Sequence, residues 1–398
     1  MISRLSIAFG LVLGHALAVI AQDSPSLSPT QPGDLPATLR FEQLLDHGPP
    51  TSATVWLPDL EASAMIRNAR VLRAAAAAEK VREKWQLLGV EVDPFTGDVR
   101  SRADQQPSTD NEANEAIARQ EMLIAKKAID AEVIRLRNDL RIAYVDLLVT
   151  QSQLRVASEI VATSERMQPT KERATELLEH ARNSRQAEVE SANAQLRAAQ
   201  SRRTATWRNL CDLAGLPKSP PKLAAGKINA VPQAINSYQV TQAIVEGSPE
   251  MGIAKAELKL AVLRYKTARS KGDGTEASGD DEQISSDNNP LQLEVSGIVT
   301  AEEKIQQTDQ RLRSRFEDVV VQYANAQDEM KHWSTVQHAL ALADPESQPS
   351  EDTLDSLSDR LAKLRNQWAY LDSVRRFTEA TVLMNGFLLR GTSESEMP

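Results

Sequence analysis

The side chains that most often carry out bond chemistry are few in this chain and widely separated. Its five histidines are scattered over 398 residues, and its only cysteine is Cys211. His332 and His338 are six residues apart on one expected helix, so they lie on different faces and lack the i, i+4 spacing of a metal site. Cys211 lies in the apolar helix end WRNLCDLAG, where a small buried thiol is expected. With no Ser–His–Asp order, phosphate loop or Cys/His cluster, we expect no enzyme, no cofactor and no metal.

The charge and composition of the chain bear on its binding partner and on its type of core. The net charge is −9, and the basic residues are interleaved with acids along the expected helices. Phosphate binding needs concentrated Lys and Arg, so we expect no nucleic-acid partner. Aromatic residues make up only 4% of the chain and charged residues 25%, which suits narrow helix–helix seams better than a compact globular core.

Two long heptad patterns, 176 residues apart, dominate the sequence. The first runs from Ile129 to Val161 and the second from Leu312 to Leu340. Overlaying them pairs LRNDLRIAYVDLLVTQSQL with LRSRFEDVVVQYANAQDEM, and the same offset pairs two helix ends at Gly215 and Gly391. A seam that repeats every 3.5 residues stays buried by supercoiling against a partner helix. The sequence therefore predicts a mainly all-α fold of two tandem repeats of long antiparallel coiled-coil helical hairpins.

The N-terminus predicts export. Arg4 precedes an apolar run that is short for a membrane span, and Val19 and Ala21 precede the expected cleavage site. The expected order of segments is a signal peptide (1–21), an extended Pro/Ser-rich arm (22–59), a first helical repeat (60–217) with a long hairpin (112–214), a linker (218–238), a second helical repeat (239–391) with a disordered acidic insert (272–290), and a tail (392–398).

Within the repeats, a helix is expected from about Leu60 to Leu88, and Ser248 followed by Pro249 predicts the start of another. Strand signals are sparse. The segment LQLEVSGIV (291–299) alternates apolar and polar residues and predicts a strand. GVEVDPFTGDV in the first repeat is too short for two membrane-spanning strands. We therefore expect little or no residual β-barrel.

The order of these pieces resembles the TolC-like outer-membrane efflux protein family over most of residues 60–391. The resemblance rests on AYVDLLVTQSQLRVA (143–157), AEVESANAQLRAAQ (187–200), QVTQAIVEGSPEMGIAKAELKLAVLRY (239–265) and FTEATVLMNGFLLRG (377–391). It implies a homotrimer whose helices build a periplasmic tunnel, joined by a periplasmic adaptor to an inner-membrane pump. It also implies a location in the periplasm or outer membrane of a Gram-negative-type envelope. The sequence departs from the family in its reduced strands and in the absence of a tip glycine.

The resemblance further implies acidic residues just after the hairpin tips, where a ring of carboxylates narrows the tunnel entrance. Glu188 lies at the matching position of the first repeat, and Asp352 and Asp355 follow the expected tip of the second. Such a ring could select cations or bind arginines of a partner. The alternative, that they are solvated helix acids among 55 acidic residues, is the commoner case.

Two functions fit these observations. The first is an exported efflux or secretion component that forms a passive helical conduit. The alternative is a barrel-less periplasmic coiled-coil scaffold that binds envelope proteins by helix-in-groove contacts. A periplasmic adaptor also uses a coiled-coil hairpin, but it would need several flanking β-domains.

Overall fold

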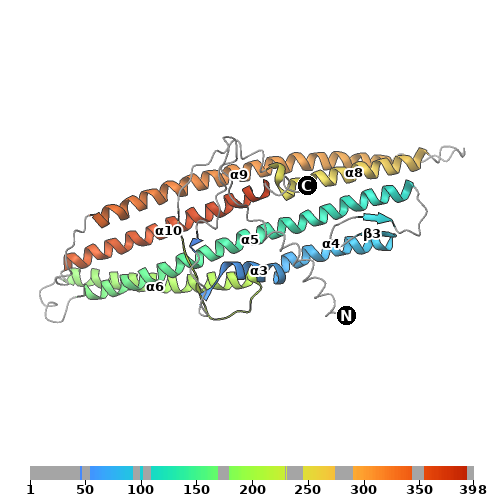
Figure 1. Ribbon diagram of the computed structural model, residues 1–398. Coiled ribbons are helices and arrows are strands. Elements are labelled where there is room, and N and C mark those ends of the chain that lie inside the picture. The colour runs from blue at the N-terminus through green and yellow to red at the C-terminus, as the bar shows by residue number, and fades with distance from the viewer. Residues whose placement is uncertain are drawn as a thin grey trace, which may run out of the picture.

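The computed structural model is an elongated array of helices that run along one common axis (Figure 1). It describes residues 45–46, 54–92, 99–101, 109–168, 179–228, 230, 245–273, 290–342 and 354–391. The predicted signal peptide, most of the predicted arm and acidic insert, and Asp352 lie outside the described residues.

Long helices make up most of the described chain. They are α3 (Leu57–Arg67), α4 (Ala69–Leu87), α5 (Thr109–Arg166), α6 (Glu179–Ala214), α8 (Pro249–Asp273), α9 (Pro290–Leu342) and α10 (Leu354–Gly391). The 58 residues of α5 correspond to roughly 87 Å of helix. The predicted fold class is confirmed: helices α5 and α6 form one long hairpin, and α9 and α10 form the other.

Helix α5 lies at the centre of the array and packs against α6, α10, α8 and α4, whereas α9 packs against α10 and α8. At one end of the molecule the order is therefore α9, α8, α5, α4, and at the other it is α9, α10, α5, α6 (Figure 1). The long helices thus lie side by side along one axis, and α5, α6 and α10 share one apolar cluster near the hairpin tips. None of the helices in the described ranges is both long and apolar enough to cross a membrane.

Short strands connect the helices. The described strands pair as β1 (Leu45–Asp46) with β6 (Lys227–Ile228), β2 (Thr54–Val55) with β5 (Leu223–Ala224), and β3 (Val90–Val92) with β4 (Val99–Ser101). The prediction of a strand at 291–299 is wrong, because this segment is the first part of α9. Its alternation matches no buried sheet face, since Leu293 and Val299 are 65% and 49% exposed. A helix satisfies its own backbone hydrogen bonds here, which a strand without a partner cannot do.

The single helix expected from Leu60 to Leu88 is divided into α3 and α4 at Asn68. The backbone of Asn68 is extended, and its side chain accepts from the Arg70 amide at 2.8 Å and donates to the Leu213 carbonyl at 2.8 Å. The end of α6 packs closely here: Gly215 has φ +65°, and a Cβ on it would lie 2.5 Å from Cβ of Arg67. The break therefore anchors the first helices of the chain to the end of the first hairpin.

The strands β2 and β5 cover the middle of α5. The Tyr144 hydroxyl of α5 lies 2.5 Å from the Ala225 carbonyl and 3.2 Å from the Val55 carbonyl. Burial raises the pKa of Tyr144 to about 12, so the hydroxyl stays protonated and able to donate. This contact ties the N-terminal strands and the linker between the repeats to the same point of the central helix.

A half-buried carboxylate joins three helices near the N-terminal end of α5. Glu121 of α5 accepts hydrogen bonds from Nζ of Lys84 at 2.8 Å, from Nε1 of Trp85 at 2.9 Å and from Nη2 of Arg264 at 3.0 Å. Burial pushes the pKa of Glu121 upward, but these donors outweigh it and the pKa is lowered. Glu121 therefore holds α4 of the first repeat and α8 of the second on the same helix.

We expect Glu121→Ala to lower the free energy of unfolding by about 2 kcal/mol, because three donors lose a charged acceptor. Denaturant unfolding of the full chain measures this change. Glu302→Ala is the matched control, because Glu302 is an exposed acid of α9 and its removal should change stability by less than about 0.5 kcal/mol. Equal effects of the two substitutions would show that Glu121 does not hold the helices together.

Candidate functional site at the contact between the two repeats

Charged residues of the first repeat pair with charged residues of the second at several heights along the molecule. From one end to the other the pairs are Glu121 with Arg264 (3.0 Å), Arg135 with Glu250 (3.3 Å), Asp146 with Arg375 (3.6 Å) and Glu188 with Arg365 (2.7 Å). The first two join α5 to α8, the third joins α5 to α10, and the last joins α6 to α10. These pairs set the register in which the two repeats lie side by side.

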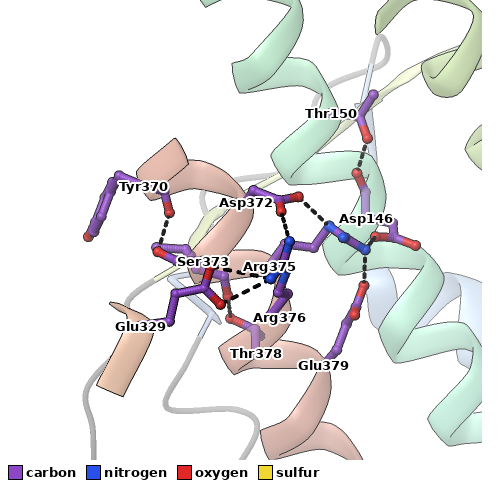
Figure 2. Close-up of polar contacts among 11 residues, drawn as sticks. Asp146, Thr150, Glu329, Tyr370, Asp372, Ser373, Arg375, Arg376, Thr378 and Glu379 are labelled. Carbon is purple, nitrogen blue, oxygen red and sulfur yellow. Dashed lines mark hydrogen bonds and ion pairs between the residues drawn. The ribbon is translucent and has the colours of Figure 1, made fainter. Parts of the chain in front are cut away.

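Arg375 lies at the centre of the most crowded of these contacts (Figure 2). Its Nη1 lies 2.8 Å from Oε1 of Glu379 and 3.6 Å from Oδ1 of Asp146, and its Nε donates to Oδ1 of Asp372 at 3.2 Å. Asp146 comes from the first repeat, whereas the other carboxylates come from α10 itself. One guanidinium group therefore faces three carboxylates.

A second arginine extends this cluster to α9. Nη2 of Arg376 donates to Oδ2 of Asp372 at 2.8 Å, and its Nη1 lies 3.1 Å from Oε2 of Glu329 (Figure 2). The cluster thus spans α5, α10 and α9, with four carboxylates facing two guanidinium groups. An excess of negative charge in a half-buried place favours binding of a proton.

The proton is held mainly by Glu379. Burial raises the pKa of Glu379, the neighbouring Asp146 carboxylate raises it further, and Arg375 opposes both, which leaves a pKa of about 7. Once protonated, the Glu379 carboxyl can donate a hydrogen bond to the Asp146 carboxylate across the contact between the repeats. Near neutral pH this contact therefore exists in two charge states.

The acids predicted at the hairpin tips are separated in the structure. Glu188 lies on α6 with 27% of its side chain exposed and is paired with Arg365 of α10. Asp355 is exposed in the first turn of α10, ten residues before Arg365, which is roughly 15 Å along a helix. Asp352 lies outside the described residues. The structure therefore brings Glu188 to an arginine of the other repeat, and a carboxylate role at the tip stays a prediction.

No known family model matches the sequence, and no curated protein sequence is similar to it. The fold, however, is similar to solved structures along almost the whole length of both chains. A membrane protein from Pseudomonas aeruginosa has 15% identity and a TM-score of 0.62, with 92% of this chain and 99% of that chain covered. The CmeC outer membrane channel of Campylobacter jejuni has 12% identity and a TM-score of 0.60, with 94% and 96% covered.

The open state of the MtrE outer membrane channel of Neisseria gonorrhoeae has 14% identity and a TM-score of 0.55, with 92% of this chain and 98% of that chain covered. The chain has the TolC-like fold. The predicted resemblance is thereby confirmed at the level of the fold.

Within this TolC-like fold, the acidic cluster around Arg375 was not predicted. Asp372, Arg375 and Glu379 have the i, i+3 and i, i+4 spacing of ordinary helix-surface ion pairs, so the pattern suggests a solvated face. What makes the cluster unusual is Asp146, which comes from the other repeat. The one available signal was an aspartate inside the apolar stretch AYVDLLV, where a charge needs a partner.

Across the described ranges, no three His, Cys, Asp or Glu side chains gather closely enough to hold a metal ion. What this cluster can do chemically is bind and release one proton at Glu379, at the contact between the two repeats.

We expect Glu379→Gln to remove part of the pH dependence of stability. The folded pKa of about 7 lies above the ordinary value of 4.5, so the folded chain binds this proton more tightly than the unfolded chain. The stabilisation is full below the ordinary value and is lost as pH rises through the folded value. Between about pH 5 and about pH 8 the wild type should lose on the order of 2 kcal/mol more than the variant.

Unfolding midpoints of the two proteins at both pH values measure this difference. Glu302→Gln, at an exposed acid far from the cluster, should keep the pH dependence of the wild type. If Glu379→Gln lost as much stability as the wild type over this range, a proton bound at Glu379 near neutral pH would be contradicted.

Proposed function

We propose that this chain is an exported, TolC-like component of efflux or secretion that forms a passive helical conduit in the periplasm. The observation that carries this proposal is the coverage of the structural match: the MtrE and CmeC channels are matched over 98% and 96% of their chains. The chain therefore resembles whole channel protomers and not only an isolated hairpin.

The arrangement of the helices supports a conduit made of several copies. Long helices that lie side by side along one axis close into a ring when one side of the array packs against the opposite side of the next copy. A homotrimer at the outer membrane, working with a periplasmic adaptor and an inner-membrane pump, is the assembly that the resemblance implies. In this function the protein is not an enzyme, because substrate diffuses through an aqueous interior and no bond is made or broken.

The hairpin tips are the proposed entrance. Each hairpin turns between residues that the structure describes, α5 to α6 in the first repeat and α9 to α10 in the second. The ion pair between Glu188 and Arg365 ties the two hairpins together close to these turns. We include Glu188, Asp352 and Asp355 in the proposal as acids at the entrance.

A scaffold of envelope proteins is the second candidate. It is favoured by the apolar seams of the two hairpins, which are already buried within one copy: Leu140, Ala143 and Leu147 in the first, and Phe316, Tyr323 and Phe377 in the second. A single copy can therefore fold stably without a ring.

Fractionation of cells that express the full chain, followed by planar-bilayer recording, separates the two functions. For a conduit we expect heat-resistant oligomers in outer-membrane fractions and stepwise channel currents from the purified protein. A soluble monomer or dimer without conductance would contradict the conduit and support the scaffold.

If Glu188 lines the entrance, Glu188→Lys should lower the preference of the channel for cations several-fold, because it reverses a charge in each copy. The reversal potential under a salt gradient measures this preference. Glu190→Lys is the matched control, because Glu190 is an exposed acid of the same helix two residues away. Equal shifts in both variants would show that position 188 has no special place in the entrance.

A further inference from the structure

A groove lies between α5 and α8, beside the contact of Glu121 with Arg264. Its volume is about 500 Å³, within the range of about 300–1,000 Å³ that is typical of sites for small ligands. Because α5 belongs to the first repeat and α8 to the second, an occupant of this groove contacts both repeats. Four of its lining residues are apolar: Ala116, Leu258, Val262 and Leu263.

The remaining lining residues of the groove are polar: Arg119, Gln120 and Lys259. Oε1 of Gln120 is buried and has no hydrogen-bond partner among the described residues, so it needs a donor from an occupant or a water molecule. The groove therefore combines an apolar surface with two cations, which is the chemistry that suits an anionic amphiphile.

Lysines gather at one end of the groove. The two ion pairs between α5 and α8 fix an antiparallel register, which places Lys126 of α5 level with Lys259 of α8, and Asp130 level with Lys255. Lys126 and Asp130 follow Arg119 by seven and eleven residues, so they lie on the face of α5 that lines the groove. All three lysines are exposed. This end of the groove therefore has three lysines and one acid, and we call Lys126 and Lys259 the lysine pair.

The charges at the opposite end of the groove are balanced. Nη2 of Arg119 donates to the Val99 carbonyl at 3.2 Å and lies 3.8 Å from Oε2 of Glu115. Glu112 is exposed one turn closer to the start of α5. In contrast, neither member of the lysine pair has an ion-pair partner within the described ranges. An acidic headgroup is therefore favoured at the lysine pair.

The apolar surface of the groove is elongated along the helices. From the lysine pair to Ala116 it extends over ten residues of α5, which is roughly 15 Å. Leu123 widens it, because this residue lies one turn after Gln120, is level with Val262 and is 36% exposed. A straight apolar chain covers such a surface better than a compact ring system does.

We propose that the groove between α5 and α8 binds a fatty acid, with its carboxylate at the lysine pair and its chain along the apolar residues from Leu258 to Ala116. The fatty acid is a bound ligand that joins the two repeats, and no bond is made or broken. The inference goes beyond the proposed function, because one folded copy contains the whole groove, whether or not copies form a conduit.

A free fatty acid fits this groove better than a lipid within a bilayer. Past the groove α8 continues with the exposed residues Arg264, Lys266 and Arg269, and α5 begins near the exposed Glu112. Charged side chains are costly in the interior of a bilayer. The ligand therefore enters the groove from water.

Calorimetric titration of the full chain with laurate, below its critical micelle concentration, tests the site. We expect saturable binding of one laurate per copy. Dodecyl maltoside has the same chain on a neutral headgroup and should bind about fivefold more weakly, because it makes no ion pair with the two exposed lysines. Equal affinities for the two amphiphiles, or no binding of laurate, would overturn the proposal.

Removal of the lysine pair tests the place of the headgroup. Lys126→Gln combined with Lys259→Gln should weaken binding of laurate about fivefold and leave binding of dodecyl maltoside unchanged. Lys80→Gln is the matched control, because Lys80 is an exposed lysine of α4 outside the groove, and it should bind laurate like the wild type. Equal effects of the lysine-pair variant and the control would contradict the assignment.

Filling the groove tests the place of the chain. Val262→Trp should abolish binding of both amphiphiles, because the larger side chain takes the space of the ligand. Val321→Trp, at an exposed position of α9, should leave binding unchanged. Circular dichroism checks that each variant folds, and if Val262→Trp does not, the lysine-pair variant, whose positions are exposed, decides the result.

Vesicles of phosphatidylglycerol separate a free fatty acid from a bilayer lipid. We expect laurate to bind without the lysine pair contributing to any sedimentation with vesicles. Vesicle binding that the lysine-pair variant loses, together with no binding of laurate, would assign the groove to a bilayer lipid and overturn the proposal. A chain that conducts but does not bind laurate would refute the fatty acid and leave the conduit intact.

Discussion

A helix that is apolar around its whole circumference must be covered on every side, and the middle of α5 is such a helix. From Ala143 to Val149 every residue is buried except Asp146. One repeat cannot cover it: α6 packs on one side, α10 of the other repeat on a second, and the strands that meet Tyr144 on a third. The two repeats therefore pack on one another, because α10 of the second covers a side of α5 that the first repeat does not cover.

The burial of this stretch also explains why Asp146 has charged partners in the other repeat. A carboxylate in a buried stretch needs a cation or a proton, and Arg375 and Glu379 of the other repeat supply one of each. The apolar packing brings the repeats together, and the charges fix their register. Near neutral pH the Glu379 carboxyl gains or loses one proton, so the strength of this contact depends on pH.

Much of the fold could be predicted from the sequence because heptad spacing is a local property. The seams containing Leu136 and Leu312 identify the two hairpins and their duplication. Alternation at 291–299 predicted a strand wrongly, because a pattern of period two does not say whether a partner strand is present. The acidic cluster could not be predicted, since its helix spacings are those of a solvated surface and its decisive member lies in the other repeat. Glu188 could be selected as a tip acid, but its partner Arg365 required the register of α6 against α10.

The duplication places two long hairpins side by side along one axis, with α5 packed against helices of both repeats. An electron cryo-microscopy map of the full chain, extracted from cells that express it, tests this arrangement and the proposed conduit most directly. The expected map is a closed ring of parallel helices, with α10 against α5 and Arg375 between Asp146 and Glu379 inside each copy. A compact bundle in which α6 and α9 of the same copy meet, with no contact between copies, would contradict it.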